Sequence, residues 1–354
     1  MIINSIRKVI NNNKLYAFMV VFILLMQAIM AFGLNHDGSL HDDSIITSEE
    51  FRTETKVREE ALKVLLINNP KLAQRFGIFF LVFMGIIVTG AVLLTEYIKK
   101  KRLRYESLPK TLEFKEPFWS VIDVVKICII FVFFYYLFSF ISGFLNSISS
   151  SGSMDRRSGL LASTGFMDIL ILMFILRFVL DKYKQGIETL GLSLKNIGKN
   201  IGIALYSYVA FLPILCALFV SVVIVAKLIN YMPQPEPVYE LIFKEARPKA
   251  LILAAFLISL LGPIVEEIFF RGFLYSALRK SIGVFWAILL SAFLFSILHT
   301  NILGFLPIMA LGLFLAYLRE KTNSLMPSIA VHIFHNSALA IMMFIVRYLT
   351  SKVS

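Results

Sequence analysis

The chain has 354 residues, of which 58% are hydrophobic and only 16% are charged. Soluble globular domains carry roughly 25% charged residues, so the composition excludes a soluble domain and predicts a polytopic membrane protein. The net charge is +12 at pH 7. In a membrane protein such an excess is typical of cytoplasmic loops rich in Lys and Arg, so it does not indicate nucleic-acid binding.

The first apolar segment, residues 15–34, is long enough to cross a bilayer and follows a basic, acid-free stretch. It lacks the short core and small-residue cleavage site of a signal peptide, so we expect an anchor with a cytoplasmic N-terminus. Residues 48–67 read as a helix lying outside the membrane. A second span, residues 76–98, ends in the basic run 99–104, which is the strongest cytoplasmic marker in the chain.

Three spans follow at residues 121–145, 160–180 and 201–226. Asp168 falls inside the apolar run of the second of these and could touch a pathway. If that helix began at Phe166, Asp168 would be a solvated residue at a helix end, and this is the interpretation favoured by the sequence.

Four further apolar segments follow at residues 250–278, 284–299, 304–318 and 326–348. They bring the total to about nine spans. The predicted fold is therefore an all-α polytopic membrane protein in the cell membrane. Residues 1–110 are predicted to form an N-terminal membrane hairpin with an extracytoplasmic loop. Residues 111–200 form a middle part with a basic inner linker, and residues 201–354 form the C-terminal core.

Three ionisable side chains, Glu266, Glu267 and Arg271, interrupt the apolar segment 250–278. A charge at the centre of a membrane helix costs about 2.5–3.5 kcal/mol on insertion scales, so a functional site is the default interpretation. Glu267 and Arg271 are four residues apart and share a helix face, whereas Glu266 lies about 100° around the helix. We interpret Glu267–Arg271 as a neutralising pair and Glu266 as the working carboxylate. The alternative is that all three face a watery vestibule.

Histidines mark two of the remaining apolar segments. Phe295 and His299 are four residues apart, and so are His332 and Asn336, which places each pair on one helix face. His335 points in another direction. A single intramembrane histidine is more often a helix–helix hydrogen bond than a ligand, so the argument for a site depends on the clusters meeting.

Helical rise places the clusters at compatible depths. Glu266 lies roughly 21 Å along its helix from the basic turn at Lys280. After a hairpin turn near Gly283, His299 lies roughly 24 Å along the returning helix, so the two side chains reach a similar level. His332 lies roughly 16 Å from the basic turn that precedes its own helix. Gly262-Pro263 should kink the helix just before Glu266 and free a carbonyl, which is tolerated where backbone lines a cavity. We therefore expect one polar cavity within the C-terminal helix bundle.

Three motifs occur in order, and they are Glu266-Glu267-x-x-x-Arg271, Phe295-x-x-x-His299 and His332-x-x-x-Asn336. Together they resemble the signature of the CAAX protease and bacteriocin-processing family, also called CPBP or Abi, which includes the Ras-converting CAAX endopeptidase. The resemblance covers about residues 251–344. It implies an intramembrane glutamate-type endopeptidase.

The resemblance also implies roles for these residues. Glu266 and His299 would activate the attacking water, and His332 and Asn336 would form the oxyanion site. Glu267, Arg271 and Phe295 would support them. The implied chemistry agrees with the residue types, because a carboxylate in an apolar cavity is suited to accept a proton near neutral pH.

Two alternatives remain open from the residues themselves. Glu266, His299 and His332 could hold zinc with one open position, although no His-Glu-x-x-His motif occurs. The polar cavity could instead serve a transporter or a peptide-binding scaffold without activity, although the repeats common in transporters are absent. The preferred reading needs no cofactor. Its expected partners are the lipid bilayer and a membrane-associated peptide or protein substrate, such as a bacteriocin leader or a signalling peptide, and no nucleic acid.

Overall fold

The computed structural model describes residues 13–36, 48–103, 114–148, 156–231, 237–299 and 302–351. Within these ranges every regular element is a helix, which confirms the all-α prediction. Six helices in the described part of the chain are long and apolar enough to cross a membrane. The protein is therefore a multi-pass membrane protein. The basic segment before residue 13, residue 104 of the basic run and residues 149–155 lie outside the described residues.

The nine predicted spans are all helical, although three of them do not count among these six. The first of these three is the apolar helical stretch Lys14–Ile29, which is shorter than the six counted helices. The span 284–299 belongs to one 50-residue stretch, Pro248–Ile297, in which Gly283 alone leaves the helical conformation, with φ 80° and ψ 171°. This left-handed φ suits a residue without a Cβ, and it lies where the hairpin turn was predicted. The span 304–318 forms the helix Phe305–Thr322, which carries charges in its last turn.

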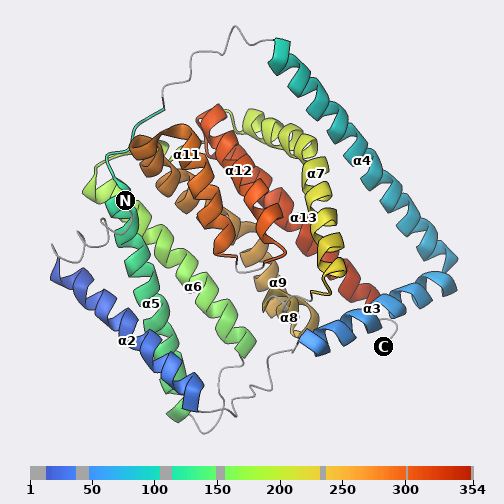
Figure 1. Ribbon diagram of the computed structural model, residues 1–354, viewed down its shortest axis with the longest axis horizontal. Coiled ribbons are helices and arrows are strands. Elements are labelled where there is room, and N and C mark those ends of the chain that lie inside the picture. The colour runs from blue at the N-terminus through green and yellow to red at the C-terminus, as the bar shows by residue number, and fades with distance from the viewer. Residues whose placement is uncertain are drawn as a thin grey trace. The chain divides into compact units, whose positions relative to one another are not determined.

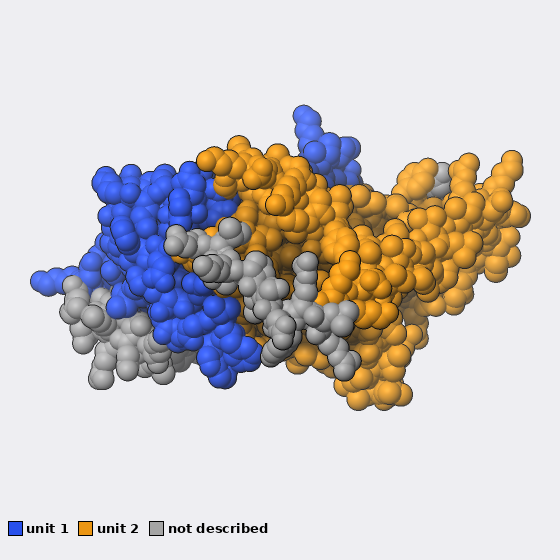
Figure 2. Space-filling model, turned by 90° about the horizontal axis from the view of Figure 1, so that it is seen from above, with its two compact units in different colours: residues 1–45, 115–192, 245–287 blue, residues 46–114, 193–244, 288–354 orange. Residues whose placement is uncertain are grey.

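The described residues form two compact units, shown in different colours in Figure 2. Unit 1 consists of residues 1–45, 115–192 and 245–287, and unit 2 of residues 46–114, 193–244 and 288–354. The three-part division proposed from the sequence stays a prediction.

Unit 1 contains regular α-helices joined to tighter and wider helical turns. Its elements are α2 (Lys14–His36), α5 (Val121–Ile148), α6 (Arg156–Leu176), η1 (Arg177–Lys182), η2 (Ile187–Leu190), α9 (Pro248–Phe256), η3 (Leu257–Leu261), α10 (Gly262–Glu267), η4 (Ile268–Leu274) and the first part of α11 (Tyr275–Ile297). Helix α2 packs against α5, and α5 against α6 (Figure 1). The α2–α5 contact is a core of Tyr16 and Met19 against Ile129 and Ile130. Helix α6 also packs against the α9–η4 stretch, which carries the two glutamates.

Unit 2 is built around α7. Its elements are α3 (Ser48–Asn68), α4 (Pro70–Leu103), α7 (Ile197–Leu228), α8 (Pro237–Lys244), the second part of α11, α12 (Phe305–Thr322) and α13 (Met326–Thr350). Helix α7 contacts α4, α12 and α13 (Figure 1). Its buried residues Ala204 and Leu215 join Leu315 and Val331 in one apolar core. This core packs α13, which carries the His332–Asn336 motif, against α7 and α12.

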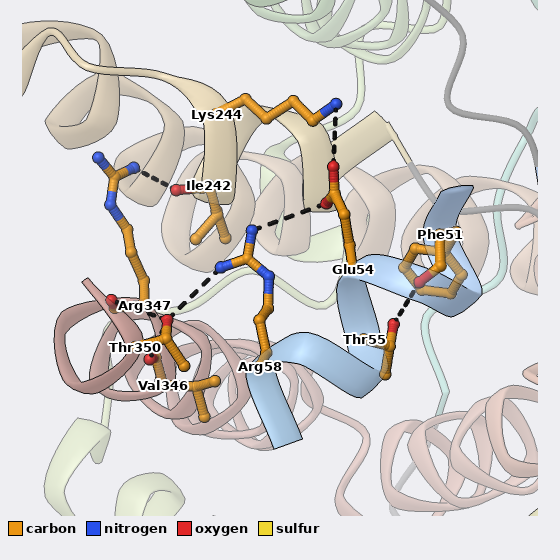
Figure 3. Close-up of polar contacts among 9 residues, drawn as sticks. All are labelled: Phe51, Glu54, Thr55, Arg58, Ile242, Lys244, Val346, Arg347 and Thr350. Atoms are coloured by element: carbon orange, nitrogen blue, oxygen red, sulfur yellow. Dashed lines mark hydrogen bonds and ion pairs between the residues drawn. The ribbon is translucent and has the colours of Figure 1, made fainter. Parts of the chain in front are cut away.

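Helix α3, which confirms the helix predicted at 48–67, is tied to α8 and the end of α13 by polar contacts (Figure 3). Arg58 lies 3.7 Å from the carboxylate of Glu54 and donates to the Thr350 hydroxyl at 3.5 Å. Lys244 of α8 reaches the same Glu54 at 3.4 Å. Arg347 donates to the backbone carbonyl of Ile242. The contacts of Glu54 and Arg58 hold the charged helix α3 against α8 and α13 within unit 2.

Candidate active site

The two glutamates lie on a short α-helix between two π-helical segments. The N–H of Gly262 donates to the carbonyl of Leu257, five residues earlier, and closes the first segment, η3. The N–H of Tyr275 donates to the carbonyl of Phe270 and closes the second, η4. Wider turns of this kind are rare and occur frequently at functional sites. A π-helical turn thus ends at Gly262, while the kink and freed carbonyl expected at Gly262-Pro263 stay a prediction. The wide turn at η4 was not foreseen.

Gly262 is needed at the first wide turn because the backbone approaches it closely. A Cβ at this position would lie 2.9 Å from the carbonyl oxygen of Leu257. Glu266 is half-buried, and its carboxylate folds back along the helix, since Oε1 lies 3.9 Å from the same Cβ position. The wide turn thus leaves room for the carboxylate that the sequence singles out.

Glu267 and Arg271 form the ion pair that their spacing predicts. Nη1 of Arg271 donates to Oε1 of Glu267 at 2.6 Å, and both side chains are fully buried. The charge of Glu266 also acts on Arg271. Since removing one partner of a buried pair leaves an uncompensated charge, the pair should hold the segment in one conformation. Glu266, by contrast, is only half-buried.

A buried tryptophan supports the second wide turn from outside the predicted motifs. Trp119 is fully buried, and its indole N–H donates to the carbonyl of Phe273 at 2.9 Å. The two rings also stack, with centroids 5.2 Å apart. A π-helical turn disturbs the regular pairing of backbone groups, and Trp119 satisfies one of them. The sequence signal was weak, since Trp119 lies in a short polar link before α5.

Asp168 corrects one expectation. Its helix, α6, begins at Arg156 rather than at Phe166, so Asp168 lies three turns inside the helix and is half-buried. The predicted role as a solvated end residue is wrong. The residues before Phe166, including Ser163 and Gly165, continue the helix. Asp168 lies close enough to Glu266 for the charge of Glu266 to act on it.

In unit 2, His299 occupies a turn just beyond the end of α11 at Ile297 rather than the helix itself. Its ring still contacts Phe295, with centroids 4.6 Å apart, as the four-residue spacing predicted. Nearby, the hydroxyl of Ser296 donates to the carbonyl of Phe305 at 2.6 Å. This bond ties the end of α11 to the start of α12 and so holds the turn.

One hydrogen bond determines the tautomer of His299. Nδ1 lies 2.8 Å from the backbone carbonyl oxygen of Phe295. A carbonyl oxygen can only accept, so Nδ1 carries the proton and donates it. In the neutral ring Nε2 is then unprotonated and able to accept a proton or to orient a water molecule.

His332 is almost completely buried on α13 and lies edge-on to the ring of Phe295, with centroids 5.6 Å apart. Phe295 therefore touches both histidines of the predicted set. His335 points elsewhere, as expected, and its Nδ1 lies 3.1 Å from the hydroxyl of Tyr208 on α7. Asn336, one turn after His332, is half-buried.

The described residues thus place the predicted set in two groups. Glu266, Glu267 and Arg271 lie together in unit 1, and the residues that include His299 and His332 lie together in unit 2. The convergence of the two groups in one cavity stays a prediction. Among the described residues, no group of three or more His, Cys, Asp or Glu side chains is placed to hold a metal ion.

The class of protein follows from these observations. It is a helical, multi-pass membrane protein with carboxylates and imidazoles inside its membrane-spanning segments. Ionisable groups at this depth are expensive and generally functional.

Comparison with known proteins is consistent with this class. Residues 248–338 match the model of the family described as "Type II CAAX prenyl endopeptidase Rce1-like". An 84-residue stretch is 34% identical to the Bacillus subtilis (strain 168) protein named "Putative membrane peptidase YdiL". That stretch covers 24% of this chain and 34% of the relative, so the chain matches about a third of the relative's length. No solved structure matches. The family match confirms the resemblance that the three motifs indicated, and it covers all seven of their residues.

Proposed function

We propose that the chain is an intramembrane endopeptidase of the glutamate type. The observation that carries the proposal is a carboxylate, Glu266, beside a fully buried Glu267–Arg271 pair within a membrane-spanning stretch. The family match over residues 248–338 supports peptide-bond hydrolysis as the reaction.

In the proposed mechanism, Glu266 takes a proton from water while Nε2 of His299 orients that water. The resulting hydroxide attacks the scissile carbonyl carbon. His332 and Asn336 donate to the developing oxyanion, and a single donor of this kind is typically worth about 10²–10³ in rate. Glu267 and Arg271 hold the segment, and Phe295 positions the two imidazoles against which it packs.

We propose a membrane-associated peptide or protein as substrate, with bacteriocin leaders and signalling peptides as the first candidates. The family's name adds prenylated peptides ending in Cys-aliphatic-aliphatic-X. We further propose that the N-terminus is cytoplasmic, because the basic run at 99–104 is the strongest cytoplasmic marker and two spans precede it.

The test is cleavage of a peptide library by the purified full-length protein in detergent, read by mass spectrometry. The library contains farnesylated Cys-aliphatic-aliphatic-X peptides and unmodified leader-like peptides. Glu266→Gln should abolish every cleavage made by the wild type while the protein folds and inserts, because Gln keeps the shape of Glu without its basicity. Glu116→Gln, at an exposed position of the same unit, is the matched control and should cleave normally. Full cleavage by the Glu266→Gln protein would remove Glu266 from the mechanism.

The proposed mechanism uses no metal, and chelation tests this. Activity should survive strong chelators in detergent, and His299→Ala should cut the rate strongly while the peptide still binds. A zinc enzyme would lose its activity on chelation. Zinc would then restore that activity with about one ion per chain, and this result would replace the proposed mechanism with a metalloprotease.

A further inference from the structure

Asp168 is a membrane-embedded carboxylate that none of the three motifs includes, and it lies outside the family match at 248–338. It belongs to the candidate membrane span Leu161–Lys182. In the described part of the chain it forms no ion pair, and none of its oxygens makes a hydrogen bond. A charged side chain in such a segment is costly and calls for a function.

Helix packing places Asp168 on the side of α6 that faces the glutamates. Helix α6 contacts α9, η3, α10 and η4 in turn. Gly165, one turn before Asp168, packs closely against Leu257, since a Cβ on Gly165 would lie 3.4 Å from that leucine's Cδ2. The carboxylate of Glu266 folds back toward Gly262 on the same stretch. The two carboxylates are therefore neighbours within unit 1.

The charged groups around α6 act differently on Asp168 and on Glu266. The titratable and charged groups on elements packed against α6 are Asp123, Lys126, Cys128, Tyr135, Tyr136, Arg177, Asp181, Lys182, Lys249, Glu266, Glu267 and Arg271. Glu266 is the one whose charge acts on Asp168. The nearby cation, Arg271, interacts instead with Glu267 and Glu266. Two neighbouring carboxylates in apolar surroundings resist carrying two negative charges.

We propose that Asp168 and Glu266 together hold one proton, that this proton resides on Asp168, and that Asp168 acts as the general acid that protonates the leaving amine. This inference rests on the proposed endopeptidase function. Glu266 accepts a proton from water, and the hydroxide bonds to the carbonyl carbon. Asp168 gives its proton to the amide nitrogen as the carbon–nitrogen bond breaks and the oxyanion reforms the carbonyl. The proton on Glu266 then passes to Asp168, which restores the starting state.

Whether Asp168 carries a proton is tested without any substrate. Infrared difference spectra of the full-length protein are recorded while the pH is raised from neutral to alkaline. The wild type should show the carbonyl stretch of a protonated carboxylic acid, and Asp168→Asn should lose it. Asp181→Asn, an exposed position at the end of the same span, should keep it. In Glu266→Gln the band should disappear at lower pH than in the wild type, because the neighbouring like charge is gone. A band that persists in Asp168→Asn, or a wild type without one, would overturn the proposal.

The donor role is tested on a peptide that the wild type cleaves, together with its analogue in which an ester replaces the scissile amide. An ester's leaving oxygen needs less help from an acid than an amine does. Asp168→Asn should therefore slow amide cleavage by about 10²-fold and leave ester cleavage nearly unchanged, whereas Glu266→Gln should fail on both. Asp168→Glu should restore part of the amide rate.

The two proposals fail in different ways. Wild-type amide cleavage by Asp168→Asn would contradict the acid role and leave the endopeptidase assignment intact. Equal loss on amide and ester would also contradict it, because a merely structural role would affect both. Normal cleavage by Glu266→Gln would reject the endopeptidase mechanism, and the infrared band would still decide whether Asp168 holds a proton.

Discussion

Helix α4 and the stretch Pro248–Ile297 are both apolar enough to span a membrane, yet they differ in how the protein uses them. Only 6% of the most apolar window of α4 is buried inside the protein, against 39% for Pro248–Ile297. Helix α4 is the more apolar of the two and is regular throughout. The second stretch contains two π-helical turns and a buried ion pair.

In these two stretches the more apolar helix is the less buried one. An apolar side chain gains little by moving from lipid to protein, because lipid tails are as apolar as leucine. A charged side chain must be enclosed by protein or water. The less apolar stretch is therefore the one that the protein encloses, and substitutions there should have the larger effects.

The largest effect is expected from Glu267→Gln, which removes the carboxylate that Arg271 contacts at 2.6 Å. Breaking a buried pair from one side typically costs about 3–5 kcal/mol, so thermal unfolding in detergent should shift strongly downward. Glu59→Gln is the matched control. It removes a partner of Lys63 at the same four-residue spacing, but on exposed side chains of α3.

The unfolding midpoint of Glu59→Gln should stay at the wild-type value, because exposed pairs contribute little. Equal shifts for the two variants would mean that burial does not make the Glu267–Arg271 pair contribute more than an exposed pair.

A smaller effect should follow from Leu278→Ala, since Leu278 is almost completely buried near the start of α11. Such truncations cost about 2–5 kcal/mol when the cavity does not collapse. The control is Leu81→Ala on α4, where the leucine is 70% exposed. Its unfolding midpoint should change little, and a loss as large as that of Leu278→Ala would show that α4 is enclosed by protein after all.

Much of this contrast was predictable from local patterns. Apolar runs located the membrane-spanning helices, and the spacing of Glu267 and Arg271 predicted their ion pair. Gly283 marked the break in the long stretch. These features depend on the period of the helix and on residues with special backbone preferences, which a sequence displays directly.

What escaped prediction depends on tertiary packing. The wide turn at η4 is braced by Trp119, which is more than 150 residues away in the chain. The sequence favoured a solvated helix end for Asp168, and only the packing of α6 on the glutamate-bearing stretch shows its neighbour. The residues proposed as catalytic stay predictions, because their roles depend on two groups that lie in different units.

The smallest effect concerns a position where α4 approaches α7 closely. A Cβ on Gly90 would collide with the carbonyl oxygen of Val209 on α7 and would also press on Pro213. Pro213 follows Val209 by four residues and has no N–H, so this carbonyl loses its usual helical partner. The absence of a side chain at Gly90 lets α4 approach that carbonyl, where a Cα–H can contact the oxygen.

Gly90→Ala should therefore destabilise the protein by about 1–3 kcal/mol, the usual range for overpacking, and weaken cysteine crosslinks between α4 and α7. Gly85→Ala on the same helix, where a Cβ meets nothing within 4 Å, should leave both measurements unchanged. Pro213→Ala restores an N–H for Val209 and should draw the carbonyl back into α7. The double variant should then lose less stability than the two single losses added together, because neighbouring sites couple. Strict additivity would mean that the carbonyl freed by Pro213 is not what Gly90 accommodates.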